Sequence, residues 1–408
     1  MNVMNERCAG LDVHKALIVA CVRTQTTSKV SEEIREFGAT TSELVKLAEW
    51  LESEQVNTVA MEATGVYWRP VWHILAEQFD LILANPARIK NAPGRKTDVK
   101  DAAWIAKLLA HGLIEHSFVP PPIIQEARDL TRTRKQLTRE VVQHTQRIQK
   151  VLEDANIKLS SVLTDTLGVS GRAIIAALIQ GVTDPEALAS LARGRAKNKH
   201  DDLREALWGR VTDHHRFMLK QHIDLILHLE NAQLRIEGRL DEILQPFRED
   251  VERLSTIPGV STIVAQVIIA EIGLDMSQFH SVAHLRSWAC LCPRNDESAG
   301  KRRSTAVRKG STWLKTALVQ SAWAGSRTKR SYIRAQFHRI RGRRGTKKAA
   351  IAVASSILTA AYFIIRDKVE YNELGSDYFD RRDKTAVAKR HVRRLQELGF
   401  DVEISPAA

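Results

Sequence analysis

The feature that most constrains the fold of this chain is a series of apolar runs within residues 7–86. Three strand-like runs, CAGLDV, ALIVACV and EEIREFGA, follow one another, and two more, NTVAMEA and DLILANP, alternate with helical stretches at 41–53 and 67–78. Consecutive strands followed by alternating helices and strands are typical of an α/β layer with a mixed sheet. We expect a further helix at 98–111 and a proline triplet at 120–122 that ends this first domain.

The middle of the chain carries a seven-residue repeat of apolar side chains. In residues 123–155 the repeat places Leu130, Leu137 and Val151 at one core position and Val141, Ile148 and Ala155 at the other. A second repeat runs through His222, Ile226, Leu229, Gln233, Ile236, Leu240 and Ile243. Arg134 and His144 interrupt the first seam. Two such helices form an antiparallel coiled-coil arm, a dimer interface or both, or they are two helices of an ordinary bundle.

The segment after Pro246 predicts a helical third domain. Its first residues, LSTIPGVSTIVAQVIIAEIG, contain a helix end, a turn at Pro258 and Gly259, and a second helix, as in a helix-hairpin-helix element. The glycine lets backbone N–H groups approach a phosphate, although a plain α-hairpin without a ligand has the same pattern. The uncharged run at 349–365 is alanine-rich and shorter than the roughly 20 apolar residues that a bilayer needs, so we expect a buried helix.

The expected fold class is therefore α/β plus all-α, with four regions. They are an α/β domain at 1–119, a helical, coiled-coil arm at 120–246, a helical domain at 247–375, and a basic, polar tail at 376–408.

The net charge of +13 comes from one segment. Residues 301–348 contain 16 Lys and Arg and no Asp or Glu, whereas the rest of the chain has 45 basic and 48 acidic residues. Phosphate backbone is the commonest partner of such a field, and a membrane surface, an acidic protein or a solubilising face are the alternatives. Trp313, Trp323, Tyr332 and Phe337 lie among these charges, where they either stack on bases or belong to the core.

The cysteines and the first residues indicate the compartment. The four cysteines form no CxxC pair, so neither a disulfide framework nor a zinc ribbon is expected. The first residues enter a strand-like run without the basic start, apolar stretch and cleavage site of a signal peptide. We therefore expect a cytoplasmic protein with small, buried cysteines and no membrane association.

Four carboxylates are candidates for a metal site. Asp12 ends the first strand and Glu62 the fourth, where adjacent strand ends bring side chains together, and Asp98 and Asp101 share one helix face. Their convergence requires a cation, and Mg²⁺ (or Mn²⁺) prefers carboxylate oxygens, water and substrate phosphate. Each aspartate alone is also explained as a cap, a turn residue or a partner of the helix dipole. Glu62, between an apolar strand and a Gly turn, has no such folding role.

Five motifs occur in order along the chain: GLDVHK, MEATGVYW, KTDVKDA, IPGV with AEIG downstream, and NDESAGKRRSTAVRKGSTWLKTAL. Together they closely resemble the transposases of the insertion sequence 110 family, the DEDD-type recombinases. The resemblance covers residues 11 to about 371 and is weakest at 168–200. The chain departs from the family after Ser298, where Ala precedes the Gly that directly follows the serine in many members.

The resemblance implies an N-terminal domain similar to the RuvC resolvase, on a ribonuclease-H-like sheet, with Asp12, Glu62, Asp98 and Asp101 as metal ligands. It also implies that Ser298, in a C-terminal transposase domain, is a nucleophile that forms a covalent phosphoserine link to DNA. A neutral serine hydroxyl needs activation, and metal held in the other domain is the economical source.

Basic residues near Ser298 are expected to hold phosphate and to offset charge in the transition state. The predicted nucleic-acid contacts are Lys301, Arg302, Arg303, Arg308, Lys309, Arg341, Arg343 and Arg344, with Pro258 and Gly259 at the hairpin.

The family further implies partners. Its members use a structured noncoding RNA of the element, whose loops pair with target and donor DNA. The expected partners are therefore DNA, a guide (bridge) RNA, and other copies of the chain, as a dimer or as a tetramer in the synaptic complex, at the nucleoid. Pairing by RNA explains why the sequence shows no base-reading module.

The leading hypothesis is a metal-assisted, serine-dependent recombinase that acts in an RNA-guided oligomer. One alternative is a metal-dependent nuclease or junction resolvase without a covalent intermediate. The other is a noncatalytic architectural protein that binds nucleic acid.

Overall fold

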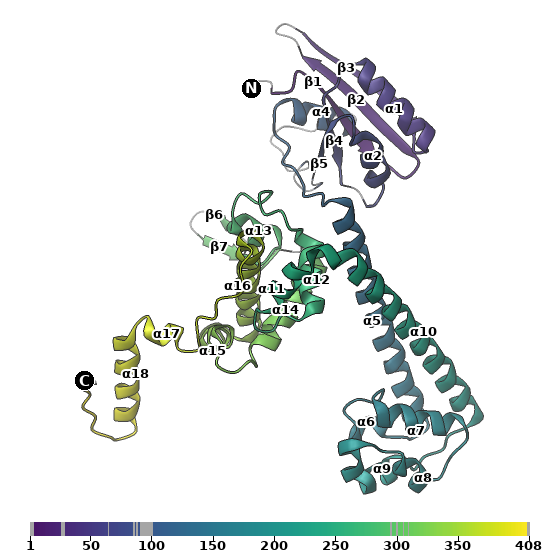
Figure 1. Cartoon of the computed structure of the whole chain (residues 1–408), viewed down its shortest axis with the longest axis vertical. Helices are drawn as coiled ribbons and strands as arrows, with labels where there is room; N and C mark the ends of the chain where they lie inside the picture. Colours follow the sequence, from purple (N-terminus) through teal and green to yellow (C-terminus); the bar gives the residue numbers. More distant parts are fainter. Residues whose placement is uncertain are drawn as a thin grey trace. The chain divides into compact units, whose positions relative to one another are not determined.

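The computed structural model describes residues 4–25, 29–63, 65–84, 86, 89, 101–293, 296–298, 301–304, 306–308 and 310–405. The chain forms two compact units, 1–119 and 120–408 (Figure 1). The first is an α/β layer and the second is mostly helical, which confirms the predicted fold class at this level.

A five-stranded mixed sheet forms the centre of the first unit, in the order β3-β2-β1-β4-β5. Strands β1 (Arg7–Val13), β2 (Leu17–Gln25) and β3 (Val30–Gly38) pair antiparallel in sequence order. Strand β4 (Thr58–Glu62) pairs parallel with β1 and with β5 (Asp80–Ala84). The edge strand β3 is mostly exposed and highly charged, which disfavours pairing with another sheet.

Helices cover both faces of this sheet. Helices α1 (Thr41–Ser53) and α2 (Trp68–Leu75) pack on one face, in a core that includes Leu11 of β1. Helix α4 (Asp101–Ala110) packs on the other face, in a core that includes Cys8 of β1. Alternate side chains of β1 therefore belong to two different cores, which is why the strand is apolar throughout.

Two of the four cysteines are buried, as predicted. Burial raises the pKa of the Cys8 thiol to about 11 and that of Cys21 to about 12. Both thiols therefore stay protonated at neutral pH and act as small apolar side chains. Cys290 and Cys292 are only half-buried.

Two long helices form an arm in the second unit. Helices α5 (Pro122–Asp154) and α10 (Asp213–Leu244) lie side by side (Figure 1). At one end of the arm they share a core with a group of short helices. These are α6 (Leu159–Val162), α7 (Val169–Ile179), α8 (Pro185–Ser190), η1 (Gly194–Lys199) and α9 (His200–Ala206).

Polar contacts interrupt the apolar packing in the middle of the arm. The Gln233 side chain donates to Thr138 Oγ1 at 2.9 Å, and the Nδ1 atoms of His144 and His222 lie 3.2 Å apart. Arg134, which interrupts the apolar repeat, is buried and donates to an oxygen of α12 instead. The two helices therefore pack through both polar and apolar side chains, and Ile226, between His222 and Gln233, is completely buried.

The rest of the second unit is a helical core. Its helices are η2 (Gln245–Phe247), α11 (Arg248–Ser255), α12 (Thr262–Ile272), α13 (Val282–Trp288), α14 (Thr312–Gly325), α15 (Tyr332–Arg344), α16 (Thr346–Asp367), α17 (Tyr378–Arg381) and α18 (Lys384–Glu397). Helices α11, α13, α14 and α15 all contact α16.

Helix α16 is, among the described residues, the one helix long and apolar enough to cross a membrane. In its most apolar stretch 61% of the residues are buried inside the protein. Side chains such as Val353, Ile357 and Leu358 are completely buried in the helical core. This packing agrees with the predicted buried helix.

A short antiparallel hairpin interrupts the helices between α13 and α14. It consists of β6 (Asp296–Ser298) and β7 (Lys301–Ser304). The sequence predicts only helices here, because strands of three and four residues are too short to produce a recognisable alternation of apolar and polar side chains.

Candidate active site and nucleic-acid surface

Asp12 and Glu62 lie at the carboxyl ends of two adjacent parallel strands. Strands β1 and β4 pair through Leu11 and Met61, and the two acidic residues come next in each strand. Because side chains alternate along a strand, both carboxylates project from the same face as Ala60, the face covered by α4. Paired strands lie about 4.8 Å apart, so the two residues are neighbours.

Helix α4 brings Asp101 to the same edge of the sheet. The Asn5 side chain, just before β1, donates to the carbonyl oxygen of Leu109 near the end of α4 at 2.9 Å. Further along the chain, Gly10 of β1 lies against Ala102. Helix α4 therefore runs antiparallel to β1, and its first residue lies where β1 ends.

The structure describes three of the four predicted metal ligands, because Asp98 lies outside the described residues. Asp12 is about a quarter exposed, its Oδ2 lies 3.2 Å from His14 Nε2, and Asp101 is exposed. Within the described ranges, no three His, Cys, Asp or Glu side chains form a group that could hold a metal ion. The edge thus gathers hard oxygen donors of the kind that Mg²⁺ prefers, but they do not form a complete ligand set.

Gly10 allows α4 to pack this closely. A Cβ atom at this position would lie 2.3 Å from both the Ala102 carbonyl oxygen and the Ala106 amide nitrogen. We expect Gly10→Ala to lower the free energy of unfolding by about 1–3 kcal/mol, because the methyl group pushes α4 away from β1. Thermal unfolding of the full chain measures this effect. Gly238→Ala is the control, because no atom lies within 4 Å and the substitution favours the α10 helix. An unchanged unfolding temperature for Gly10→Ala would contradict the close packing.

Ser298 lies on a basic hairpin in the second unit. It is the last residue of β6 and pairs with Lys301, which is exposed at the start of β7. The side chains of Ser298, Arg302 and Arg303 lie outside the described part of the structure, as does Lys309. Arg308 donates to Ser287 Oγ at 3.0 Å. The backbone therefore places Ser298 beside at least one exposed cation.

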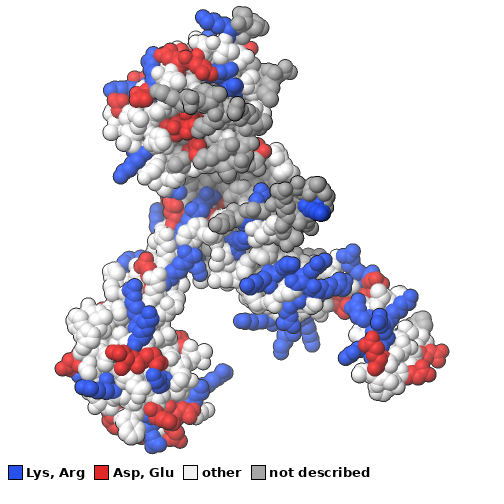
Figure 2. Space-filling view, turned by 180° about the vertical axis from the view of Figure 1, so that it is seen from behind, with Lys and Arg blue, Asp and Glu red and all other residues white. Residues whose placement is uncertain are grey.

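A second group of predicted nucleic-acid contacts lies on α15. This helix has five arginines and no acidic residue, and its last turn carries Arg341, Arg343 and Arg344, all exposed. The exposed Lys347 and Lys348 follow at the start of α16. Figure 2 shows Lys and Arg side chains gathered on the helical part that carries α15. Such a surface attracts phosphate backbone.

The turn at Pro258 and Gly259 is tightly packed. Gly259 has a φ of +90°, and a Cβ atom there would lie 2.4 Å from Ser321 O and Gly325 N of α14. The packing against α14 is therefore sufficient reason for the glycine. A phosphate contact at this turn remains a prediction.

Glu271, in the AEIG motif, has a role that the sequence pattern does not reveal. It is 1% exposed, and its carboxylate accepts two hydrogen bonds from Arg132 of α5, at 2.8 and 3.0 Å, and one from Ser311. Arg128 donates to the carbonyl oxygens of Ala270 and Glu271. These bonds hold the end of α12 against α5. Only the motif itself points to Glu271, because its partners are far away in sequence.

We expect Glu271→Ala to lower the free energy of unfolding by about 2–3 kcal/mol, because Arg132 loses its partner in a largely buried site. The partial exposure of Arg132, 31% of its side chain, keeps the cost below that of a fully buried pair. Urea unfolding of the full chain gives the value. Glu242→Ala removes an exposed pair with Arg239 and should cost less than about 1 kcal/mol. Equal effects of the two substitutions would contradict the structural role of Glu271.

The fold and these groups define a class of protein. A mixed sheet with carboxylates at one edge, followed by a helical unit with a strongly basic surface, is the organisation expected of a metal-using enzyme that acts on nucleic acid.

Comparison with protein families narrows this class. Residues 9–157 match a DEDD-type model described as a transposase, and residues 251–338 match a model described as the transposase IS116/IS110/IS902 family. The two matches cover more than half of the chain, so the chain belongs to this IS110 family of transposases, enzymes that cut and rejoin DNA. The DEDD type implies the use of a divalent metal ion.

Curated relatives agree with this assignment. The chain is 24% identical to the pilin gene-inverting protein of Moraxella lacunata and 23% identical to that of Moraxella bovis, over 91% of this chain and 99% of each relative. It is 31% identical to the transposase for insertion sequence element IS1111A of Coxiella burnetii, over 26% of this chain and 30% of that protein.

Proposed function

We propose that this transposase exchanges DNA strands through a covalent phosphoserine intermediate at Ser298, assisted by Mg²⁺ at Asp12, Glu62, Asp98 and Asp101. The observation that carries the metal site is the neighbouring position of Asp12 and Glu62 on the α4 face, with Asp101 at the same edge. Like charges gathered in this way favour a divalent cation. The assignment of Ser298 is supported by the family motif and by the basic hairpin.

The exchange requires two balanced steps. The Ser298 hydroxyl gives up its proton, and its oxygen forms a bond to phosphorus while the bond to a deoxyribose oxygen breaks and that oxygen takes up a proton. A hydroxyl of another strand then loses its proton and its oxygen forms a bond to the same phosphorus, while the bond between phosphorus and the serine oxygen breaks and that oxygen takes up a proton. Bound Mg²⁺ would supply Lewis acidity that favours the deprotonated hydroxyl. Lys301 and Arg308 are suited to hold the phosphate.

The proposed assembly includes other macromolecules. We propose that a bridge RNA of the element selects the DNA, and that the arm at 120–246 joins copies of the chain as a coiled coil. The domain at 1–119 would hold the metal, and the domain at 247–375 would supply the serine. The tail at 376–408 would add basic contacts to nucleic acid. The assembly would act at the nucleoid. Because metal site and serine belong to different units, assembly is the proposed means of completing the active site.

The names of the Moraxella relatives support recombination over simple hydrolysis. Those proteins are named for inverting a pilin gene, and inversion requires cut strands to be joined again. A hydrolytic nuclease would release ends without new junctions.

Sequencing of DNA junctions tests this function. Cells that carry the gene with its native flanking DNA are expected to accumulate new junctions between element and flank, and cells with Glu62→Gln are not. Broken ends without new junctions in the wild type would support the nuclease instead. Junctions at the wild-type level in Glu62→Gln would contradict the metal site.

A further inference from the structure

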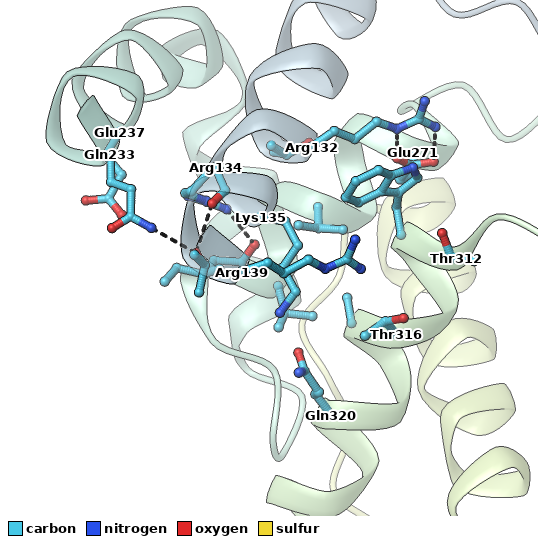
Figure 3. A pocket seen from close by; sticks show the side chains of 17 residues that line it. Arg132, Arg134, Lys135, Arg139, Gln233, Glu237, Glu271, Thr312, Thr316 and Gln320 are labelled. Atoms are coloured by element: carbon cyan, nitrogen blue, oxygen red, sulfur yellow. Dashed lines mark hydrogen bonds and ion pairs between the residues drawn. The ribbon is translucent and has the colours of Figure 1, made fainter. Parts of the chain in front are cut away.

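A cavity of about 380 Å³ lies in the second unit where the arm meets the helical core (Figure 3). Helices α5, α10, α12 and α14 form its walls. The volume is in the range of pockets that bind small ligands, about 300–1,000 Å³. None of its lining residues belongs to the predicted catalytic set, so the cavity is a separate candidate site.

The cavity has more basic than acidic side chains: its lining contains four cations, Arg132, Arg134, Lys135 and Arg139, and two carboxylates, Glu237 and Glu271. Arg132 is bound to Glu271, and Arg134 is bonded to Gln266. Lys135 and Arg139 make no ion pair with any residue that the structure describes. Both extend from α5 toward α14 in Figure 3. Two cations without an ion-pair partner in a recess are suited to one phosphate group.

An aromatic ring lies beside these cations. Trp313 of α14 is half-buried in the cavity wall, with the guanidinium of Arg139 5.2 Å and that of Arg132 5.7 Å from its ring centroid. By contrast Phe337, another aromatic of the basic segment, is a buried core residue. The remaining wall includes apolar side chains such as Val267. An indole ring with adjacent cations is the combination that stacks on a base and binds its phosphate.

We infer that this cavity binds one nucleotide of a single-stranded segment, with the base against Trp313 and the phosphate at Lys135 and Arg139. A paired duplex does not fit, because its bases are stacked and cannot enter a recess of this size. The chemistry is shared by RNA and DNA, and both are tested below. The inference does not depend on strand cleavage, because binding requires neither Ser298 nor the carboxylates.

The phosphate contact is tested by binding without divalent metal. Fluorescence anisotropy of the full chain with labelled single-stranded oligo-U and oligo-dT gives the affinity and its salt dependence. Lys135→Gln and Arg139→Gln are each expected to weaken binding about tenfold and to lower the slope of log K against log salt by about 0.7. Lys150→Gln is the matched control, because Lys150 is an exposed residue about three turns further along α5. Duplex binding should stay at the wild-type level in all three variants.

The base contact is tested with the same method. Trp313→Ala is expected to weaken binding of oligo-dT about 5- to 100-fold, and Trp313→Phe much less, because a phenyl ring still stacks. An abasic oligonucleotide should bind Trp313→Ala and wild type alike. A thermal unfolding curve verifies that each variant is folded, and equal losses with the abasic strand would contradict stacking.

The measurements with oligo-U and with oligo-dT show whether the nucleotide belongs to RNA or to DNA. An equal loss of affinity for oligo-U and oligo-dT supports a pocket that accepts RNA and DNA. A loss of affinity for only one of them supports that nucleic acid as the occupant. Lys135→Gln and Arg139→Gln variants that bind both strands as tightly as Lys150→Gln would overturn the inference. Because cleavage is not measured, that result would leave the proposed recombination untouched.

Discussion

Replacing Asp12 by Asn is expected to slow metal-dependent DNA cleavage by about 10²–10³-fold or more. Asparagine has nearly the size of aspartate, so the pairing of β1 with its neighbours is kept. One charged ligand oxygen is lost, however, and Mg²⁺ binds a neutral amide more weakly than a carboxylate. The measurement is the rate at which DNA from the flank of the gene is cut in the presence of Mg²⁺, together with thermal unfolding of the variant.

Asp80→Asn is the matched control for this prediction. Asp80 is an exposed carboxylate at the start of β5, and β5 runs parallel to β4 in the same sheet. Asp80 therefore lies at the amino-terminal end of the parallel strands, whereas Asp12 lies at their carboxyl end. Wild-type cleavage is expected for Asp80→Asn. Asp12→Asn that cuts as fast as Asp80→Asn would exclude the metal site at the carboxyl edge.

Ser298→Ala is expected to abolish strand joining and to slow cleavage by at least about 10³-fold, because no other group replaces a lost nucleophile. The substitution removes one oxygen from a short strand of the hairpin, so little change in stability is expected. The test follows labelled DNA with Mg²⁺ and separates cut, joined and protein-bound strands under denaturing conditions.

Ser304→Ala serves as the comparison on the same hairpin. Ser304 lies on β7, and its hydroxyl accepts a hydrogen bond from the Ala306 amide at 3.1 Å. Its removal should affect the local turn but leave joining intact. If Ser298→Ala still cuts DNA at the wild-type rate, the enzyme uses water as the nucleophile, and the proposed mechanism is wrong.

The elements of the first unit were accessible from sequence because each has a strong local pattern. Strands β1, β2, β4 and β5 are short apolar runs, and α1 has helical spacing over 13 residues, as α5 of the second unit has over 33. Helices α6, α8 and α9 have only four to seven residues, and the eleven residues of α7 are mostly apolar without a marked polar face, so no local pattern predicts them. The hydrogen bond between Thr138 and Gln233 in the arm is likewise absent from any local pattern, because the two residues are 95 positions apart.

The candidate sites also contain some residues that a local pattern predicts and others that depend on contacts between distant parts of the chain. The positions of Asp12 and Glu62 at the ends of two strands predicted that they are neighbours, because parallel pairing brings the carboxyl ends of adjacent strands side by side. The direction of α4, which brings Asp101 there, depends on the close contact at Gly10. Glu271 and its partner Arg132 are 139 residues apart. The cavity at Trp313 needs four helices from distant parts of the chain, so no motif predicts it.

In the proposed mechanism a serine of this chain carries DNA covalently during recombination. The most direct measurement is mass spectrometry of the protein–DNA adduct formed with Mg²⁺, after denaturation and digestion to peptides. A nucleotide attached to Ser298, absent without metal and absent in Asp12→Asn, is the expected result. Cut DNA with no nucleotide on the protein, or a nucleotide on a different residue, would contradict a phosphoserine intermediate at Ser298.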